Sequence, residues 1–258
     1  MATKKENIAR VGLSAIGFVY ILVGVLTALK TFNLGGREVG TKGVIGFLSG
    51  QPVAKVLLAA VAIGLFSYTF WRFYQTFTDS RNLGTKLNAL FVRAGFFTGG
   101  LFYGSLGFIA LKLLFGAGYD TQQESVIKLL NSSFGSISAV IIGLIFGSKA
   151  LFEIYFILSN QFKKNVQSSK IKPEIQKLLL NLGIIGHSAR GIIFGIMSFL
   201  TIRTGLTFRN EKMSKLTDAF QFIDQNFGAF VLSIVAVGMS CYGLFMLVKA
   251  RYLYINMK

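Results

Sequence analysis

The sequence predicts an all-α membrane protein with six transmembrane helices, on the basis of composition, six apolar runs and an internal repeat. Hydrophobic residues make up 53% of the 258 residues, charged residues make up 14%, and the mean hydropathy is +0.60. Soluble domains carry about 25% charged residues. The 29 Gly and 26 Phe residues, with only two Pro, suit helices that pack in lipid. We therefore expect an integral membrane protein.

The net charge is +17. In a soluble protein this charge would favour a nucleic-acid partner. In a membrane protein, Lys and Arg mark the borders of the spans and bind anionic headgroups. We therefore expect the bilayer and its anionic lipids as partners, together with a possible membrane-protein partner, and no nucleic acid. Cys241 is the single cysteine, so it forms no intrachain disulfide.

Six apolar runs, each flanked by basic residues, are predicted to span the membrane. They cover residues 11–29, 56–71, 94–111, 134–158, 183–202 and 227–248. The first run resembles the apolar part of a signal peptide, but no small-x-small cleavage site follows it. It also belongs to the internal repeat, so we expect it to be retained as a helix.

The six runs are three copies of a helix pair, at residues 8–80, 90–162 and 175–252 of a single membrane domain, 1–258. One fixed set of offsets aligns the first, third and fifth runs, and nearly the same offsets align the second, fourth and sixth. The matched sets are Gly12, Gly95 and Gly186; Gly17, Gly100 and Gly191; Tyr20, Tyr103 and Phe194; Gly24, Gly107 and Ser198; Tyr68, Lys149 and Tyr242; Trp71, Phe152 and Phe245; and Arg72, Glu153 and Met246.

A two-helix repeat returns the chain to its starting side, so the three copies share one orientation. They are predicted to surround a pseudo-threefold axis along the membrane normal, as parallel repeats. The segments on the N-terminal side hold most of the Lys and Arg residues and few acids. The positive-inside rule then places both termini in the cytoplasm.

Short amphipathic helices are predicted in the three outer loops, beginning at Thr41, Gln123 and Lys215. Their apolar residues recur at helical spacing over about three turns, too few to span a bilayer. Pro52 suits the first turn of the second span, and Pro173 the start of an extension into the fifth.

Arg190 is an ionisable residue inside the fifth span. It corresponds to Ile16, six residues past Arg10 at the cytosolic border. At about 1.5 Å per residue it should lie about 9 Å inside the membrane. Ionisable groups at such a depth are costly, and are by default candidates for function.

The repeat places Lys149, Glu153 and Arg72 at a depth similar to that of Arg190. Helical periodicity puts His187 on the same face as Arg190, and Tyr68 on the same face as Arg72. A shared polar cavity open to the cytosol would bring together the candidate ligand-binding residues Arg190, His187, Lys149, Glu153, Arg72 and Tyr68.

Three cations and one carboxylate favour an anionic ligand: a carboxylate, a phosphate or a lipid headgroup. Structural explanations compete: Glu153 could pair with Arg190 only to lock two helices, Arg72 and Lys149 could extend to headgroups, and His187 could bond a carbonyl. The sequence carries no HExxH, GxSxG or Walker motif. We therefore expect no enzyme, no metal site and no cofactor.

The repeated Arg-x-Gly…Gly…Tyr…Gly pattern of RVGLSAIGFVYILVG, with HSARGIIFG and QPVAKVLLAAVAIGLFSYTFWRFYQ, resembles a bacterial membrane family, domain-of-unknown-function family 1206. The resemblance covers about residues 9–250. It implies three tandem two-helix repeats and a bacterial inner membrane, and it brings no activity, cofactor or catalytic residue. Members often keep an Arg before the second glycine in more than one repeat, whereas Ile16 and Gly99 replace it here.

Two functions follow as hypotheses. The first is a cytosol-facing cationic pocket that binds or passes a small anion, a proton or an anionic lipid headgroup. Arg190 and Lys149 would be its anchors, Glu153 their counter-charge and His187 a proton-sensitive neighbour. The second is a scaffold or assembly partner that transports nothing. The polar residues outward of Ser198 are Thr201 and Thr204, which disfavours a continuous path.

Overall fold

The computed structural model describes residues 4–34, 40–78, 84, 87–116, 135–158, 166, 171–207 and 216–252. The regular secondary structure of these residues is helical. The helices are α1 (Lys4–Thr31), α2 (Thr41–Ser49), α3 (Ala54–Phe77), α4 (Leu87–Leu114), α6 (Gly135–Leu158), α8 (Pro173–Leu206) and α9 (Leu216–Tyr252). All except α2 are long and apolar enough to cross a membrane. The prediction of six candidate spans is therefore confirmed, and the protein is a multi-pass membrane protein.

The predicted outer helices have three outcomes. The first is α2, a nine-residue helix. The second lies outside the described residues. The third is the start of α9, which runs to Gly228, where φ is +81° and the helix kinks. Glycine is favoured in this left-handed region because it has no Cβ.

Both prolines lie at a helix start. Pro173 begins α8, as predicted. Pro52 lies in the turn just before α3, outside its first helical turn.

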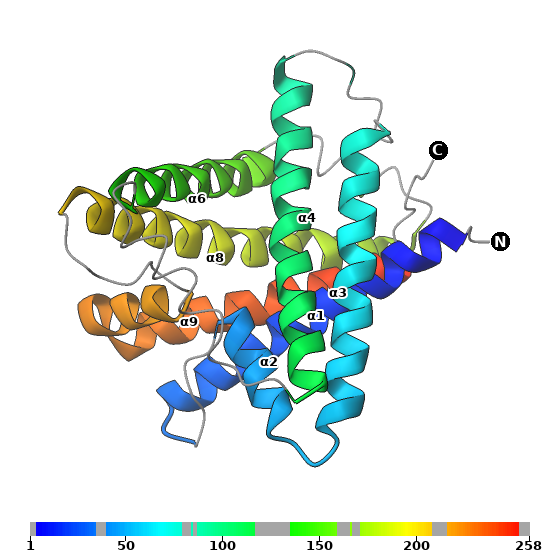
Figure 1. Ribbon diagram of the computed structural model, residues 1–258, viewed down its shortest axis with the longest axis horizontal. Helices are drawn as coiled ribbons and strands as arrows, with labels where there is room; N and C mark the ends of the chain where they lie inside the picture. Colours follow the sequence, from blue (N-terminus) through cyan, green and yellow to red (C-terminus); the bar gives the residue numbers. More distant parts are fainter. Residues whose placement is uncertain are drawn as a thin grey trace.

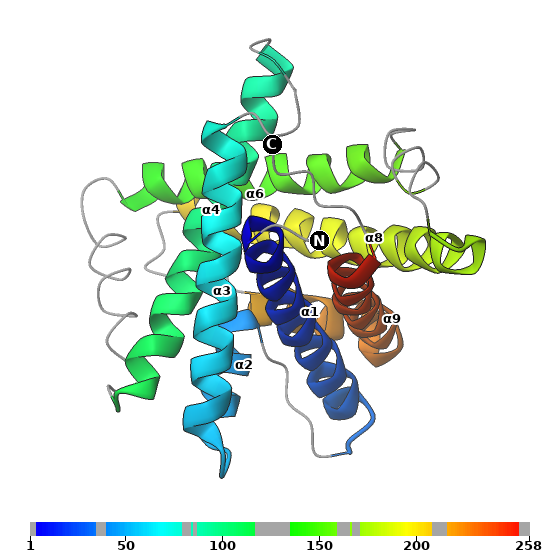
Figure 2. The ribbon, with the colours of Figure 1, turned by 90° about the vertical axis from the view of Figure 1, so that its right-hand side faces the viewer.

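The six long helices form three closely packed pairs, which are α1 with α9, α3 with α4, and α6 with α8. Further contacts join α8 to α9 and α1 to α3, and α2 packs on α1, α3 and α4. Figures 1 and 2 show α3 and α4 running side by side and crossing α1 steeply. The molecule is therefore a set of crossed helix pairs.

Glycines permit the closest helix approaches. A Cβ at Gly12 of α1 would lie 2.5 Å from the backbone N of Tyr68, and a Cβ at Gly186 of α8 would lie 2.5 Å from Cα of Tyr242. Any larger residue would push these helices apart. Gly186 and Tyr242 occupy the positions in the last repeat that Gly12 and Tyr68 occupy in the first. The α1–α3 and α8–α9 pairs therefore pack alike.

Candidate functional site

A carboxylate and two basic side chains meet between α6 and α8. The Arg190 guanidinium lies 3.0 Å from Glu153 Oε1. The other carboxylate oxygen of Glu153 pairs with Nδ1 of His187. All three side chains are buried. A charge in such surroundings requires a partner, and Glu153 is the partner of both bases.

The close approach of α6 and α8 puts these groups within reach of one another. The Ser198 hydroxyl donates a 2.8 Å hydrogen bond to the carbonyl of Gly143. A Cβ at Gly191 would lie 3.5 Å from Cβ of Glu153. Gly143 and Gly191 thus leave room for the two backbones, and the short Glu153 side chain then reaches Arg190.

Aromatic rings surround the Arg190 guanidinium. Its Cζ lies 4.1 Å from the ring centroid of Tyr242, 5.2 Å from that of Phe194 and 5.4 Å from that of Tyr20. Cations are attracted to such ring faces, more strongly when water is excluded. The Nε of Arg190 is buried without a hydrogen-bond partner among the described residues.

Four tyrosines from α1, α3, α4 and α9 meet beside Arg190, and we name them the tyrosine centre: Tyr20, Tyr68, Tyr103 and Tyr242. The hydroxyls of Tyr20 and Tyr103 lie 3.1 Å apart. Tyr103 packs edge-on against Tyr68, and Tyr20 packs edge-on against Tyr242, with 4.9 Å between ring centroids in both pairs. These hydroxyls place polar groups at the centre of a core that is otherwise mainly apolar.

Arg72 approaches this centre from α3. Its Nε donates a 2.7 Å hydrogen bond to the Tyr68 hydroxyl, and its Nη1 donates a 3.1 Å bond to Gln75 Oε1. Its Cζ also lies 4.9 Å from the ring centroid of Trp71. These neutral partners hold Arg72 in position without cancelling its charge.

Lys149 of α6 lies within electrostatic reach of Arg190, Arg72 and Glu153. It is half-buried. Arg72, Lys149, Glu153, His187 and Arg190 are named the charged cluster here. Arg72, Lys149 and Arg190 are three bases with one carboxylate, so the cluster keeps an excess of basic groups.

The structure brings all six predicted site residues together: Tyr68 and the five members of the charged cluster. Their role in binding a ligand stays a prediction. The sequence analysis used Tyr20, Tyr103 and Tyr242 only to align the repeats and did not include them among the candidate site residues. The repeat register held the signal, because Tyr20 matches Tyr103 and Tyr68 matches Lys149 and Tyr242.

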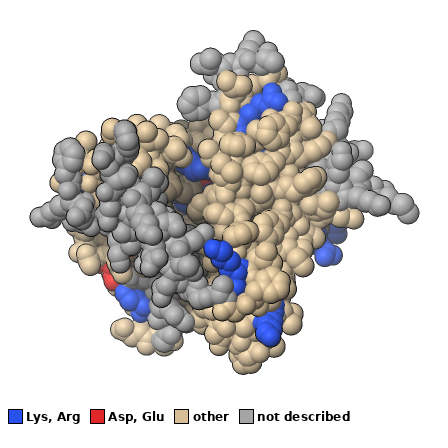
Figure 3. Space-filling view, in the orientation of Figure 1, with Lys and Arg blue, Asp and Glu red and all other residues tan. Residues whose placement is uncertain are grey.

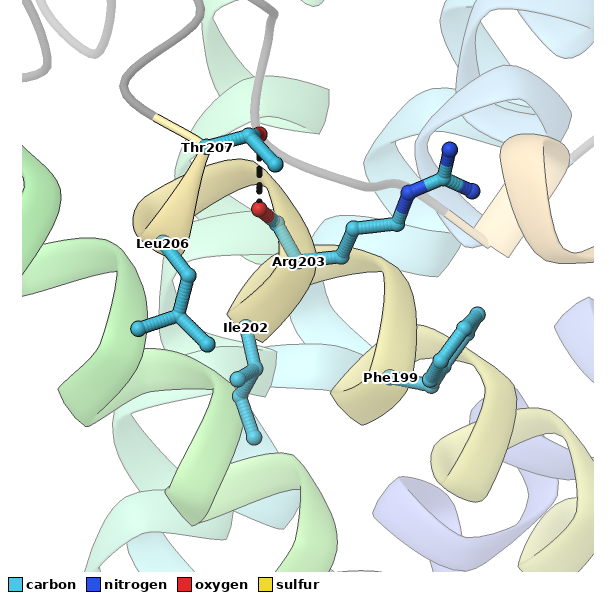
Figure 4. A pocket seen from close by; sticks show the side chains of 5 residues that line it. All are labelled: Phe199, Ile202, Arg203, Leu206 and Thr207. Atoms are coloured by element: carbon cyan, nitrogen blue, oxygen red, sulfur yellow. Dashed lines mark hydrogen bonds between the residues drawn. The ribbon is translucent and has the colours of Figure 1, made fainter.

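The described residues contain no group of three His, Cys, Asp or Glu side chains that could hold a metal ion. A cavity of about 350 Å³ lies elsewhere, at the C-terminal end of α8 (Figure 4). Its lining is mostly apolar and comprises Phe199, Ile202, Arg203, Leu206 and Thr207. It is separate from the charged cluster.

Comparisons with known proteins give a family and one relative. The family described as Domain of Unknown Function (DUF1206) matches residues 11–79 and 185–253, just over half of the chain. "Uncharacterized protein YxxB" of Bacillus subtilis (strain 168) is 29% identical over 250 residues, covering 96% of this chain and 90% of the relative. No solved structure matches.

The two matched segments begin one residue before Gly12 and Gly186. Each of these glycines contacts a tyrosine within its own segment, Tyr68 and Tyr242, in the same way. Residues 90–162, the predicted middle repeat, lie outside both segments. The six apolar helices and the match over more than half of the chain agree with the family that the sequence patterns indicated. This chain belongs to the DUF1206 family.

Proposed function

We propose that this protein binds a small anion, or the anionic headgroup of a lipid, at the charged cluster, and that it is not an enzyme. The observation that carries the proposal is the imbalance of charge: among the described residues, the cluster holds three strong bases, Arg72, Lys149 and Arg190, but one carboxylate, Glu153, which pairs with Arg190. Phosphate and carboxylate groups accept charge-assisted hydrogen bonds from such bases.

The burial of the cluster strengthens the argument. An unbalanced charge inside a membrane protein is costly, and such residues usually mark a path or a binding site. Arg190 is only 8% exposed, and its Nε has no partner among the described residues. An anion beside Lys149 would balance the excess charge.

Binding is favoured over passage across the membrane. On the far side of the cluster, the buried polar side chains that the structure describes carry hydroxyls only: Thr27, Thr41, Thr201 and Ser233. A charged solute would meet little to replace its hydration there. Anion flux into liposomes that disappears in Lys149→Gln would contradict this part of the proposal.

The proposed arrangement around the site is three tandem repeats about a pseudo-threefold axis, with the cluster opening to the cytoplasm. Recurring contacts support it. Tyr103 on Tyr68 and Tyr20 on Tyr242 are matched positions with equal ring distances. The excess of Lys and Arg in the segments on the N-terminal side supports cytoplasmic termini. The family resemblance favours a bacterial inner membrane.

Phosphate binding is the direct test. Protein purified in a non-ionic detergent would be titrated with inorganic phosphate while its thermal unfolding midpoint is followed. We expect the midpoint to rise, because a ligand that binds only the folded state stabilises it. Lys149→Gln should lower the affinity about tenfold, since it removes one charge-assisted contact.

Lys172→Gln is the matched control, because Lys172 is exposed just before α8 and should leave the phosphate response unchanged. An equal response in all three proteins would mean that phosphate binds elsewhere. No response to phosphate or to an anionic lipid would leave the scaffold role as the better explanation.

A further inference from the structure

The two long helices of the middle segment, α4 and α6, are the exception in the packing. In the first segment α1 packs on α3, and in the last α8 packs on α9. Among the described residues, α4 and α6 are not a closely packed pair. This difference leaves an opening beside the charged cluster.

Backbone contacts close the first and last segments. Besides the Gly12–Tyr68 and Gly186–Tyr242 contacts, a Cβ at Gly64 would lie 2.1 Å from Cβ of Ala15. A Cβ at Gly238 would lie 2.5 Å from Cβ of Ala189. These two contacts also join matched positions of the first and last repeats. We call these the closed segments, because in each one the two long helices are in close contact at two positions along their length.

The corresponding positions of the middle segment are open. Gly95 matches Gly12 and Gly186, but no described atom lies within 4 Å of a Cβ placed there. No described atom lies within 4 Å of a Cβ at Gly99 either, but Gly99 itself is buried. In the repeat register, the partner position of Gly95 is Lys149, where the closed segments have tyrosine.

Side-chain exposure shows the same opening on α6. Phe152 is 42% exposed, whereas its counterparts Trp71 and Phe245 are 3% and 2% exposed. Ile145 is 40% exposed, at a position where the closed segments have buried glycines. We name Gly95, Ile145, Lys149 and Phe152 the α4–α6 opening.

The opening joins an apolar wall to a basic floor. Phe152 and Ile145 are apolar, and the exposed Gly95 adds no side chain on α4. Lys149 lies on α6 between Ile145 and Phe152 in sequence, and it is close enough to Arg72 and Arg190 for their positive charges to act on it. Figure 3 shows charged atoms at the bottom of a hollow beside α4.

We propose that a phospholipid with an anionic headgroup enters sideways through the α4–α6 opening. Its phosphate binds Lys149, with Arg72 and Arg190 nearby, and its acyl chains lie along Phe152, Ile145 and Gly95. The inference rests on the proposed anion site and adds the source of the anion and its route. Charge complementarity selects this occupant, because a polar head joined to apolar chains matches a basic floor between apolar walls.

Alternative occupants match the opening less well. A free soluble anion has no use for exposed apolar walls inside the membrane. A purely apolar helix from a second copy would bury Lys149 beside two other bases with only Glu153 as a counter-charge among the described residues, which is costly. An anionic lipid satisfies both the walls and the floor.

The test compares two probes on the same proteins. Native mass spectrometry of the detergent-purified chain would measure retention of phosphatidylglycerol against phosphatidylcholine, and the thermal assay would measure inorganic phosphate binding. We expect the wild type to prefer phosphatidylglycerol by about tenfold or more. Gly95→Leu, which fills open space, should remove this preference and leave phosphate binding intact.

Gly195→Leu is the matched control, since a Cβ there also meets no described atom within 4 Å. It should retain both probes. Lys149→Tyr, which places the residue of the closed segments in the opening, should lose both and serves if Gly95→Leu fails to fold.

The outcomes separate the two proposals. Phosphate binding without a lipid preference, or a lipid preference that Gly95→Leu leaves unchanged, overturns the lipid route alone. Loss of both probes in the wild type overturns the anion site itself. A cross-link from Phe152→Cys to a second copy, or to another segment of the same chain, also overturns the lipid route.

Discussion

The α1–α9 and α6–α8 pairs pack similarly but differ in the chemistry of their contact. Gly17 of α1 approaches the backbone of Gly243, and the matched Gly191 of α8 approaches that of Ala150. The α1–α9 pair then buries Ile16 and Met246. The α6–α8 pair buries Arg190 and Glu153 at the corresponding positions.

At the ends of the helix pairs, the distribution of arginine is the reverse of that in the buried contacts. Arg10 of α1 donates hydrogen bonds to the carbonyls of Ala250 and Arg251, the latter at 2.8 Å. Arg93 of α4 likewise donates to the carbonyl of Thr76, at 2.7 Å. The matched position in α8 is Ile184, so this pair has a buried Arg190 but no arginine at the position of Arg10 and Arg93.

This comparison shows that the helix contact does not require a buried ion pair. Replacing a buried ion pair by well-packed apolar residues is often neutral or stabilising. The α1–α9 pair is an internal example of such an apolar contact. We therefore propose that the buried Glu153–Arg190 pair serves binding rather than helix packing, and the following experiments test that proposal.

The largest effect is expected for Glu153→Met, which introduces the residue of the α1–α9 pair on one side only. Arg190 would remain buried without its counter-charge. Breaking a buried pair in this way costs about 3–5 kcal/mol. Thermal or denaturant unfolding in detergent micelles would measure it, and an unfolding midpoint like that of the wild type would contradict the ion pair.

The double variant Glu153→Met with Arg190→Ile should be far less destabilised than Glu153→Met alone. It reproduces the Met246–Ile16 combination and removes both charges together. We expect it to recover most of the lost stability and to lose affinity for phosphate. If it remains as unstable as the single variant, the two helix pairs are not equivalent.

A smaller effect is expected for Arg93→Gln at the end of the α3–α4 pair. The substitution removes charge-assisted hydrogen bonds to C-terminal carbonyls at a partly exposed site, so the loss should be about 1 kcal/mol. The unfolding midpoint measures it, with Lys177→Gln as an exposed control on α8. Anion binding should not change, and a change would link the helix end to the charged cluster.

The smallest effect on stability is expected for Phe152→Cys in a chain whose native Cys241 is replaced by Ser. Phe152 is exposed, so truncating it removes little packing. A membrane-permeant maleimide should label this cysteine quickly and Phe245→Cys slowly, because Phe245 is buried. Equal labelling rates would mean that the α4–α6 opening is closed in the membrane.

Much of the fold was predictable from two sequence patterns. Runs of about 20 apolar residues predicted the six long helices, and the repeat offsets predicted that Gly12 and Gly186 occupy equivalent positions, whereas Gly95 of the middle segment does not make the same contact. The crossed arrangement of the pairs was not predictable, since a two-helix repeat fixes direction but not tilt. The third outer helix was predicted as a separate element, whereas the chain is helical on both sides of the kink at Gly228 and the two parts are joined directly in α9.

The candidate site was partly predictable for the same reason. Charged residues are rare in the spans, so Arg190, Lys149 and Glu153 were identified directly. Tyr20, Tyr103 and Tyr242 were not, because tyrosine is common at membrane interfaces and in packing. Their convergence depends on how the α1–α9 and α3–α4 pairs meet, which no single helix encodes.

The steep crossing of α1 and α3 has a mechanical consequence. Helices that cross steeply touch over a short length, and here that length contains Gly12, Tyr68, Gly64 and Ala15. The α3–α4 pair rests on α1 at this contact, with further support from α2, and α4 forms one side of the α4–α6 opening. We expect a small rotation at this contact to displace distant parts of α4 further than the contact itself, so that substitutions at Gly12 or Gly64 would change the width of the proposed lipid route.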